Sequence, residues 1–271
     1  MQRFLQFRYF VATFSVIFVI GCGTALNIFS DSDDVKLGQQ LDQQIHADAK
    51  NYPIMQGHPE IKEYVMRVGN QILSSPEIKK KGVYPYKYEI IHDDKTVNAF
   101  CTPGGYIYVY TGLLKFIDNE ATLAGILGHE IAHAERRHAT NRMTKQYGMQ
   151  FLIGLALGQN PGQIAEIGAN LFSGLTLLAN SRSDETEADE FSLKYLSTST
   201  YYPGGVTYFF QKIQKEKGAS SGALERLLST HPLPQDRMDH VAELLKGMGN
   251  PQPTEPKLLS KEYQEFKKKL P

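Results

Sequence analysis

Five residues near the middle of the chain, His129 to His133, read H-E-x-x-H and constrain its fold more than any other stretch. On an α-helix, residues four apart lie on the same face, so the two histidines could bind one metal ion. Glu130 follows the first histidine and could act on a water molecule bound to that ion. The pattern therefore predicts a zinc site. The alternative is that two core or surface histidines have this spacing by coincidence.

The flanking sequence favours a helix around this motif. Asp118 or Asn119 could cap its N-terminus, and the stretch from Ala121 to Arg137 contains no proline and only two glycines. Apolar residues recur along it at helical spacing: Leu123, Leu127, Ile131 and Ala134. We therefore expect the helix to be buried.

The composition is that of an ordinary globular protein, with 41% hydrophobic and 21% charged residues among 271. Lys+Arg and Asp+Glu are equal at 29 each, and no basic patch indicates a nucleic-acid partner. The two cysteines, Cys22 and Cys101, form no C-x-x-C pair and imply no disulfide framework. No P-loop, dinucleotide fingerprint or serine nucleophile elbow is present, so no motif supports a nucleotide-dependent or serine enzyme.

The N-terminus has the shape of a secretory signal. Arg3 and Arg8 precede an apolar run from Tyr9 to Ile20, which is too short to be a convincing membrane span. The run ends in Val-Ile-Gly-Cys, which resembles the bacterial lipoprotein signal, in which the cysteine is lipidated. The alternative is an uncleaved membrane anchor with an incidental cysteine.

On the lipoprotein interpretation, residues 1–21 are a signal peptide and residues 22–34 a polar tether. Lipidated Cys22 would attach the protein to a membrane. Because Gly23 rather than aspartate follows the cysteine, the resemblance indicates the periplasmic side of the outer membrane.

The remaining sequence predicts an α+β fold, mainly helical, with a small three-stranded sheet next to the H-E-x-x-H helix. Periodicity favours further helices at 35–50, 59–72, 181–196, 204–215 and 235–245. Strands are expected at 85–92, 98–101 and 106–110. We expect one domain over 35–249, followed by a polar C-terminal tail over 250–271.

Residues 147–179 form the most apolar part of the expected domain. Gln159 to Gly162 divides this stretch into two pieces, neither of which reaches the ~20 residues that span a bilayer. A buried helical hairpin is the first interpretation, and a lid or a membrane-leaning element is the alternative.

A catalytic zinc site needs a third protein ligand and an open position for water. His138 lies nine residues after His129, one short of the metzincin spacing, and Arg136 stands where that pattern needs glycine. The metzincin interpretation therefore fails. We expect His138 to lie at the end of the helix and contact its last carbonyl groups.

Carboxylates offer a better third ligand, because residues 184–190 include five of them. Acidic residues at a helix start could merely complement the helix dipole. Glu185 and Asp189 lie one turn apart, so one could bind the metal while the other orients a ligating imidazole. Spacing alone does not choose between Glu185 and Glu187.

Several motifs together resemble the zinc endopeptidase family of HtpX, BepA and the CAAX prenyl protease. The resemblance runs from about Val35 to Leu245. The matching residues are His129 to His133 with Arg137-His138, Ser181-Arg182, Glu185 with Ala188-Asp189, Asn98-Ala99-Phe100, Pro103-Gly104-Gly105, Thr111 to Leu114, and His231-Pro232 with Arg237.

The resemblance implies a zincin-like fold and one zinc ion per chain, held by His129, His133 and Glu185. It implies that Asp189 orients a ligand and that Glu130 is the catalytic base. The chain is expected to be a lipoprotein form that lacks the helical-repeat domain of BepA and the spanning helices of the other two proteins.

Three further roles are expected, and those of His231 and of the strand are suggested mainly by the family. The loop bearing His231 is expected to approach the metal, where the imidazole either stabilises the oxyanion or occupies the open position and keeps the enzyme latent. Arg237 is expected to pair with a carboxylate near the site. The strand of Tyr106, Ile107 and Tyr108 could bind an extended substrate at an exposed edge, although its alternating pattern also suits the sheet interior.

These observations predict a zinc-dependent endopeptidase of the bacterial envelope that removes misfolded or misassembled envelope proteins. The outer-membrane assembly machinery is a further partner suggested by analogy. The competing interpretation is a lipid-anchored chaperone or assembly factor that binds partner proteins and seldom cleaves them.

Overall fold

The computed structural model describes residues 27–156, 180–216, 221–232 and 235–271. The predicted signal peptide, Cys22 and most of the apolar stretch 147–179 lie outside the described residues. Among the helices that are described, none is long and apolar enough to cross a bilayer.

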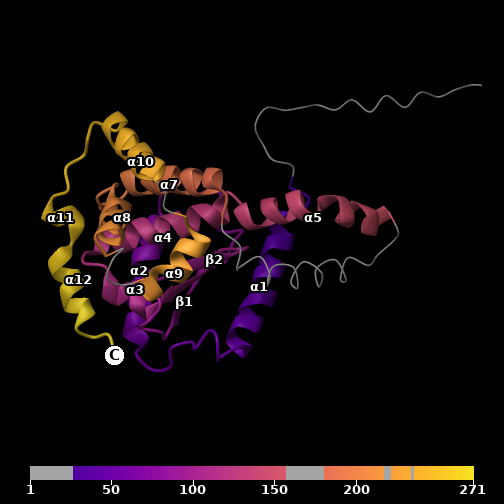
Figure 1. Ribbon diagram of the computed structural model, residues 1–271, viewed down its shortest axis with the longest axis horizontal. Helices are drawn as coiled ribbons and strands as arrows, with labels where there is room; N and C mark the ends of the chain where they lie inside the picture. The colour runs from indigo at the N-terminus through magenta and orange to yellow at the C-terminus, as the bar shows by residue number, and fades with distance from the viewer. Residues whose placement is uncertain (1–26, 157–179, 217–220, 233–234) are drawn as a thin grey trace, which may run out of the picture.

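The expected mainly helical α+β architecture is confirmed (Figure 1). The strands are β1 (Lys87–Ile91), β2 (Ala99–Thr102) and β3 (Tyr106–Tyr110). The helices are α1 (Asp31–Ala47), α2 (Pro59–Ile72), α3 (Thr111–Phe116), α4 (Glu120–Glu135), α5 (His138–Ala156), α7 (Arg182–Ser197), α8 (Gly205–Glu216), α9 (Ser221–Thr230), α10 (Gln235–Gly247), α11 (Glu255–Leu258) and α12 (Ser260–Lys267). Of these, α3, α9, α11, α12 and the start of α5 at 138–146 were not among the helices expected from the sequence.

The sheet has the strand order β1-β3-β2. Strand β3 pairs in parallel with β1, where Tyr88 is opposite Ile107, and antiparallel with β2, where Phe100 is opposite Tyr108. All five residues of β3 are buried. The expectation that Tyr106, Ile107 and Tyr108 form an exposed edge is therefore wrong, because hydrogen bonds to neighbours occupy both sides of the strand. The edge nearest the H-E-x-x-H helix belongs to β2.

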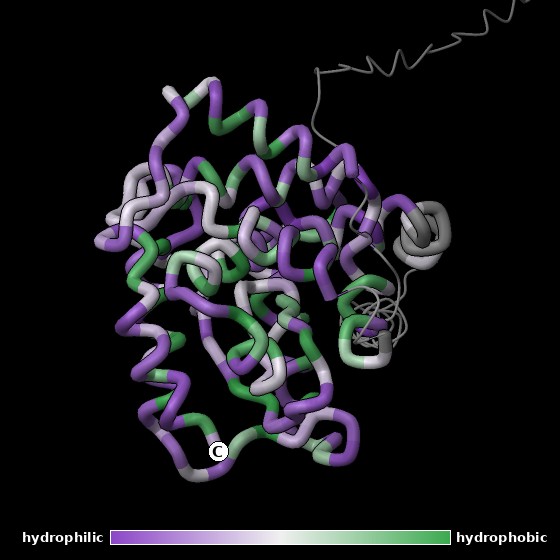
Figure 2. Tube along the Cα trace, turned by 60° about the vertical axis from the view of Figure 1, so that its left-hand side comes forward, coloured by the Kyte–Doolittle hydropathy of each residue, from purple (hydrophilic) through white to green (hydrophobic). Residues whose placement is uncertain are grey.

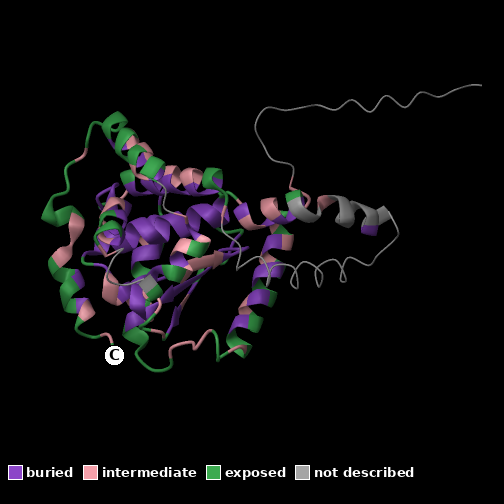
Figure 3. Cartoon of the chain, in the orientation of Figure 1, coloured by how far each residue is buried: buried purple, intermediate pink, exposed green. Residues whose placement is uncertain are grey.

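Helix α4 carries the H-E-x-x-H motif and forms the centre of the fold, and all of its residues are buried (Figure 3). Asn119 caps its N-terminus by accepting a hydrogen bond from the Thr122 amide at 2.8 Å. Helices α2, α7 and α8 and strand β2 pack around it. The apolar face of α2 is fully buried and consists of Ile61, Val65, Val68 and Ile72.

Two glycines allow α8 to cross α4 with backbone against backbone. A Cβ atom on Gly205 would lie 1.9 Å from the Ala121 carbonyl oxygen, and one on Gly125 would lie 2.4 Å from the Val206 nitrogen. Neither position can accept a side chain unless the helices separate. This contact fixes where α8 lies relative to the motif helix.

Both ends of the described chain are more ordered than the sequence predicts. Helix α1 begins at Asp31 rather than Val35, because Ser30 and Asp33 form a capping box. Residues 31–34, expected in the tether, are therefore helical. In α12, Tyr263 and Phe266 lie on one face and enter the core, so the expected polar tail packs against the domain. Figure 2 shows that the segment leading to the C-terminus is mostly hydrophilic with a few hydrophobic positions.

Candidate metal centre

Helices α4 and α7 lie against each other and bring three predicted ligands together. The Nε2 atoms of His129 and His133 are 2.9 Å apart. Glu185 from α7 places Oε2 3.3 Å from His129 Nε2 and Oε1 3.2 Å from His133 Nε2. Ser181 caps α7 and accepts a hydrogen bond from the Asp184 amide, so the first turn is well formed where Glu185 begins the ligand face.

These residues fit one zinc ion. Zinc binds imidazole nitrogen and carboxylate oxygen at about 2.0–2.2 Å in tetrahedral geometry, so its ligand atoms should lie roughly 3.3 Å apart. The measured separations of 2.9 to 3.3 Å agree with that value. Two imidazoles and one carboxylate are also a donor set of catalytic rather than structural zinc sites. His231 lies in the same group, with all four ligand atoms within 4.8 Å of one another.

A buried chain of contacts holds the first imidazole in place. The Asp189 carboxylate lies 2.8 Å from Nδ1 of His129, which leaves Nε2 directed at the other ligands. Arg237 donates two hydrogen bonds of 2.8 Å to the same carboxylate. Its third nitrogen forms an ion pair with Glu185 Oε2 at 2.7 Å without a hydrogen bond to that oxygen. That oxygen therefore keeps a lone pair for a metal.

His138 does not lie at the end of the motif helix, and that prediction is wrong. Helix α4 ends at Glu135, and Arg137 turns the chain with a φ of 60° before α5 begins at His138. Nδ1 of His138 is 2.7 Å from Nδ1 of His133, and its Nε2 is 2.8 Å from Glu187. Glu187 thus contacts His138, and the glutamate that reaches the two motif histidines is Glu185.

The electrostatics of the cluster match an electron-rich ligand set. Burial opposes protonation of His129, but the charge of Glu185 and the hydrogen bond to Asp189 raise its pKa to about 10. Burial, reinforced by the charge of His129, lowers the pKa of His133 well below its ordinary value. Burial also opposes ionisation of Glu185, but His231 and His129 hold its pKa well below the usual range. One carboxylate is thus kept ionised among imidazoles.

Glu130 lies on the same helix and points toward His231 rather than into the ligand set. Its Oε1 atom is 3.8 Å from Nε2 of His231, and the side chain is buried. Burial raises the pKa of Glu130, although the charges of His231 and His129 act in the opposite direction. A carboxyl group with a raised pKa is suited to accept a proton and later release it.

His231 follows α9 directly, and its amide donates to the Leu227 carbonyl at 2.7 Å. Its Nδ1 is 3.0 Å from Glu185 Oε1. Asn180, which the sequence did not single out, donates to the same oxygen at 2.6 Å and lies 3.3 Å from His231 Nδ1. No motif marks Asn180, although it immediately precedes the Ser181 cap.

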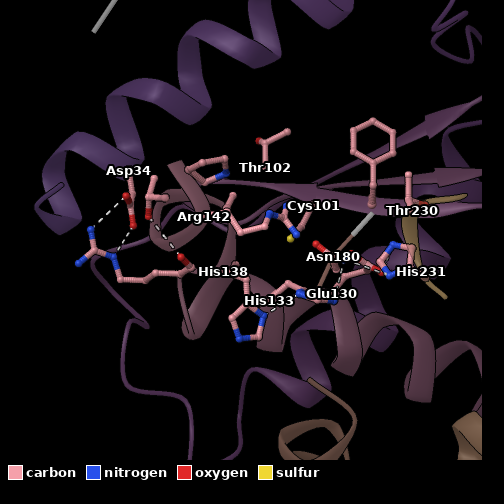
Figure 4. A pocket seen from close by; sticks show the side chains of 16 residues that line it. Asp34, Cys101, Thr102, Glu130, His133, His138, Arg142, Asn180, Thr230 and His231 are labelled. Atoms are coloured by element: carbon pink, nitrogen blue, oxygen red, sulfur yellow. Dashed lines mark hydrogen bonds and ion pairs between the residues drawn. The ribbon is translucent and has the colours of Figure 1, made fainter. Parts of the chain in front are cut away.

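Two pockets meet at Glu130 and His231. The first, termed the polar pocket, is lined mostly by polar and charged residues, which include Arg142 and Asn180, and also by Cys101 (Figure 4). The second lies toward α8 and is lined mainly by apolar side chains. These are Ala99, Leu113, Ile126, Val206, Phe209, Phe210, Ile213 and Leu227. Glu130 and His231 therefore border both cavities, whereas His133 lines the first and His129 the second.

Comparison with known proteins agrees with this geometry. Residues 59–245 match the model of a family described as peptidase family M48. The chain is 31% identical over 202 residues to the putative beta-barrel assembly-enhancing protease of Vibrio cholerae, covering 71% of this chain and 40% of the relative. It is 26% identical over 226 residues to the beta-barrel assembly-enhancing protease of Escherichia coli, covering 80% and 44%.

A third relative is the mitochondrial metalloendopeptidase OMA1 of Schizosaccharomyces pombe. It is 31% identical over 185 residues, which are 67% of this chain and 52% of the relative. The chain thus spans about half, or less, of the length of these curated relatives.

Proposed function

The chain belongs to peptidase family M48, and on that premise we propose that it is a zinc-dependent endopeptidase that acts on misfolded proteins of the bacterial envelope. The observation that carries the proposal is the placement of His129, His133 and Glu185 at tetrahedral ligand spacing, with Glu130 beside them. The names of the bacterial relatives, which refer to beta-barrel assembly, support the envelope and outer-membrane proteins as the setting.

In this proposal a zinc ion held by His129, His133 and Glu185 would lower the pKa of a water molecule toward neutrality and would polarise the scissile carbonyl. Glu130 accepts the proton of that water and delivers it to the leaving amine. Asp189 and Arg237 hold the His129 ring so that Nε2 stays directed at the metal. In this proposal an extended peptide pairs with β2, the edge strand of the described sheet that lies next to α4, which would place the scissile bond over α4.

His231 fits the latent state better than oxyanion stabilisation. It shares the ligand cluster with the three proposed ligands and contacts Glu185 at 3.0 Å, so it stands where water or substrate would bind. Pairing of its ring with Glu130 at 3.8 Å would also restrain the base. We expect a His231→Ala variant to show higher basal proteolysis than the wild type. A lower rate would assign His231 to oxyanion stabilisation instead.

The direct test compares zinc content and casein cleavage for the wild type and for Glu130→Gln. We expect about one zinc per chain in both proteins and cleavage only where Glu130 is present, because glutamine cannot accept the proton. The His231→Ala background provides sensitivity if the wild type is latent. Glu130-independent cleavage, or the absence of bound zinc, would overturn the proposal.

The lipid anchor at Cys22 is proposed on the N-terminal pattern and needs its own test. Labelling of cells with an alkyne fatty acid should mark the wild type but not a Cys22→Ser variant. The Cys22→Ser variant should also be absent from membrane fractions. The competing chaperone function predicts that Glu130→Gln still supports envelope protein assembly in cells, whereas the protease predicts loss.

A further inference from the structure

We infer that Arg142 forms a carboxylate-binding subsite of the polar pocket, so that the enzyme prefers substrates with a carboxylate close to the bond it cuts. The inference rests on the proposed endopeptidase function and adds a substrate class to it. The carboxylate could be an aspartate or glutamate side chain, or the C-terminal carboxylate of the substrate.

The position of Arg142 places it beside the catalytic groups. It lies four residues after His138 on α5 and therefore on the same helix face. It lines the polar pocket together with Cys101 of β2, Glu130 and Asn180 (Figure 4). A peptide paired with the edge of β2 would pass this guanidinium next to Glu130.

The guanidinium lacks the partners that buried arginines normally have. Its Nε and Nη1 atoms are buried, and neither has a hydrogen-bond partner among the described residues. The pKa of Arg142 is affected by Asp184, Cys101 and Glu185 only through electrostatic interactions, without a hydrogen bond. Burial of the guanidinium has the larger effect and lowers the pKa of Arg142, although these interactions would raise it. A guanidinium with unpaired donors is suited to bind a carboxylate through charge-assisted hydrogen bonds.

Other arginines of the domain show what is missing at this position. Arg67 binds Glu120 through two hydrogen bonds, Arg137 binds Asp34, and Arg237 binds Asp189. Each of these holds a carboxylate from within the protein. Arg142 faces a pocket that opens beside the proposed scissile bond, so a substrate carboxylate would complete the same kind of pair.

The first experiment measures binding, so that it does not depend on turnover. Zinc-loaded Glu130→Gln protein is titrated with fluorescein-labelled peptides of one extended sequence that carry glutamate or glutamine at one central position. A second pair differs only in a free or amidated C-terminus. We expect about 10-fold tighter binding of the acidic member of one pair, the size expected for a charge-assisted pair.

The variants assign this preference to one residue. Arg142→Gln, in the Glu130→Gln background, should bind both members of the pair equally. Lys145→Gln removes a positive charge from an exposed position of the same helix and should keep the preference. Arg142→Glu should reverse the preference toward a lysine-containing peptide. A preference within the internal pair assigns a side-chain carboxylate, and a preference within the terminal pair assigns a free C-terminus.

Thermal unfolding separates recognition from a structural role. Because Nε and Nη1 of Arg142 have no hydrogen-bond partner in the described part of the chain, Arg142→Met should unfold at the temperature of the wild type or above it, whereas a structural arginine would lower that temperature. Equal affinity for acidic and neutral peptides in the wild-type pocket, or a preference that survives Arg142→Gln, would overturn the subsite. Acid-selective binding without any Glu130-dependent cleavage would uphold the subsite and reject the peptidase function.

Discussion

Helix α4 carries three buried glutamates, Glu120, Glu130 and Glu135, and the surroundings of Glu120 and Glu130 are opposite in kind. At the N-terminal end, Glu120 accepts hydrogen bonds from Tyr64, from Arg67 at 2.9 and 2.6 Å, and from Tyr201 at 2.7 Å. Hydrogen-bond donors from the protein occupy both of its oxygens. These contacts close this end of the helix.

The part of the helix that bears the H-E-x-x-H motif brings several lone-pair donors close together. The two motif imidazoles face each other at 2.9 Å, Glu185 adds a carboxylate, and Glu130 stands beside His231. Lone pairs converge here, whereas donors converge at Glu120. The comparison shows that burial of a carboxylate does not by itself mark a functional site. A surplus of acceptors marks the end that needs a cation.

The largest expected effect is weaker zinc binding when the charge of the carboxylate ligand is removed. Glu185→Gln replaces a charged ligand with a neutral amide, so zinc affinity should fall by more than the ~100-fold that a residue behind the ligands costs. Competition with a chromogenic chelator measures this change. The matched Glu120→Gln variant should bind zinc like the wild type. Equal affinities for the Glu185→Gln protein and the wild type would remove Glu185 from the ligand set.

At the closed end, the same exchange should cost stability instead of metal. Glu120→Gln leaves Tyr64, Arg67 and Tyr201 facing a weaker acceptor. We expect the free energy of unfolding to fall by about 2–3 kcal/mol. The guanidinium of Arg67 is half exposed and can reach water, which keeps the loss below the upper range for buried pairs. Urea unfolding of the zinc-free proteins measures this fall in stability. An unchanged unfolding midpoint in Glu120→Gln would contradict the prediction.

A smaller effect should follow from residues that position ligands without binding metal. His138→Ala removes the contact with Nδ1 of His133 and leaves Glu187 bound to Arg136 alone. Zinc affinity should fall by about 10–100-fold, with the ligand atoms unchanged. If the affinity instead falls as far as in Glu185→Gln, His138 must act as a ligand itself.

The smallest effect concerns pH at the closed end. Burial opposes ionisation of Glu120, but the hydrogen bonds from Arg67, Tyr64 and Tyr201 lower its pKa below the ordinary 4.5. A lowered folded-state pKa stabilises the protein above pH 4.5, and the contribution is lost as the pH falls through the folded value. The stability gap between wild type and Glu120→Gln should therefore be constant near neutrality and narrow below pH 4.5. A gap that widens on acidification would refute this sign.

Features that depend on residues close together in the chain could be predicted from the sequence. The motif helix and the buried face of α2 are examples, because their apolar residues recur every three or four positions. Glu185 required the family resemblance, because its distance to the motif is set by how α4 packs on α7. Spacing alone left Glu187 equally eligible.

The errors have the same cause. The order of strands is not a local property, so the sequence could not show that β3 lies between its neighbours and that β2 is the free edge. His138 was misplaced because nothing in Arg136-Arg137 signals the left-handed turn at residue 137. Tyr263 and Phe266 were overlooked because two aromatic residues among lysines resemble a solvated helix until their partners, such as Tyr64, are known.

The glycine crossing of α4 and α8 limits how the apolar pocket can change. Because the two backbones already touch at Gly125 and Gly205, the wall that α8 contributes cannot approach the metal any further. Four side chains of α8 line the cavity, namely Val206, Phe209, Phe210 and Ile213, and the two phenylalanines are the largest of them. Substrate preference on this side is therefore a matter of exchanging side chains on a fixed frame. An engineer who wants the pocket to accept a bulkier residue should trim these two phenylalanines and leave both glycines untouched.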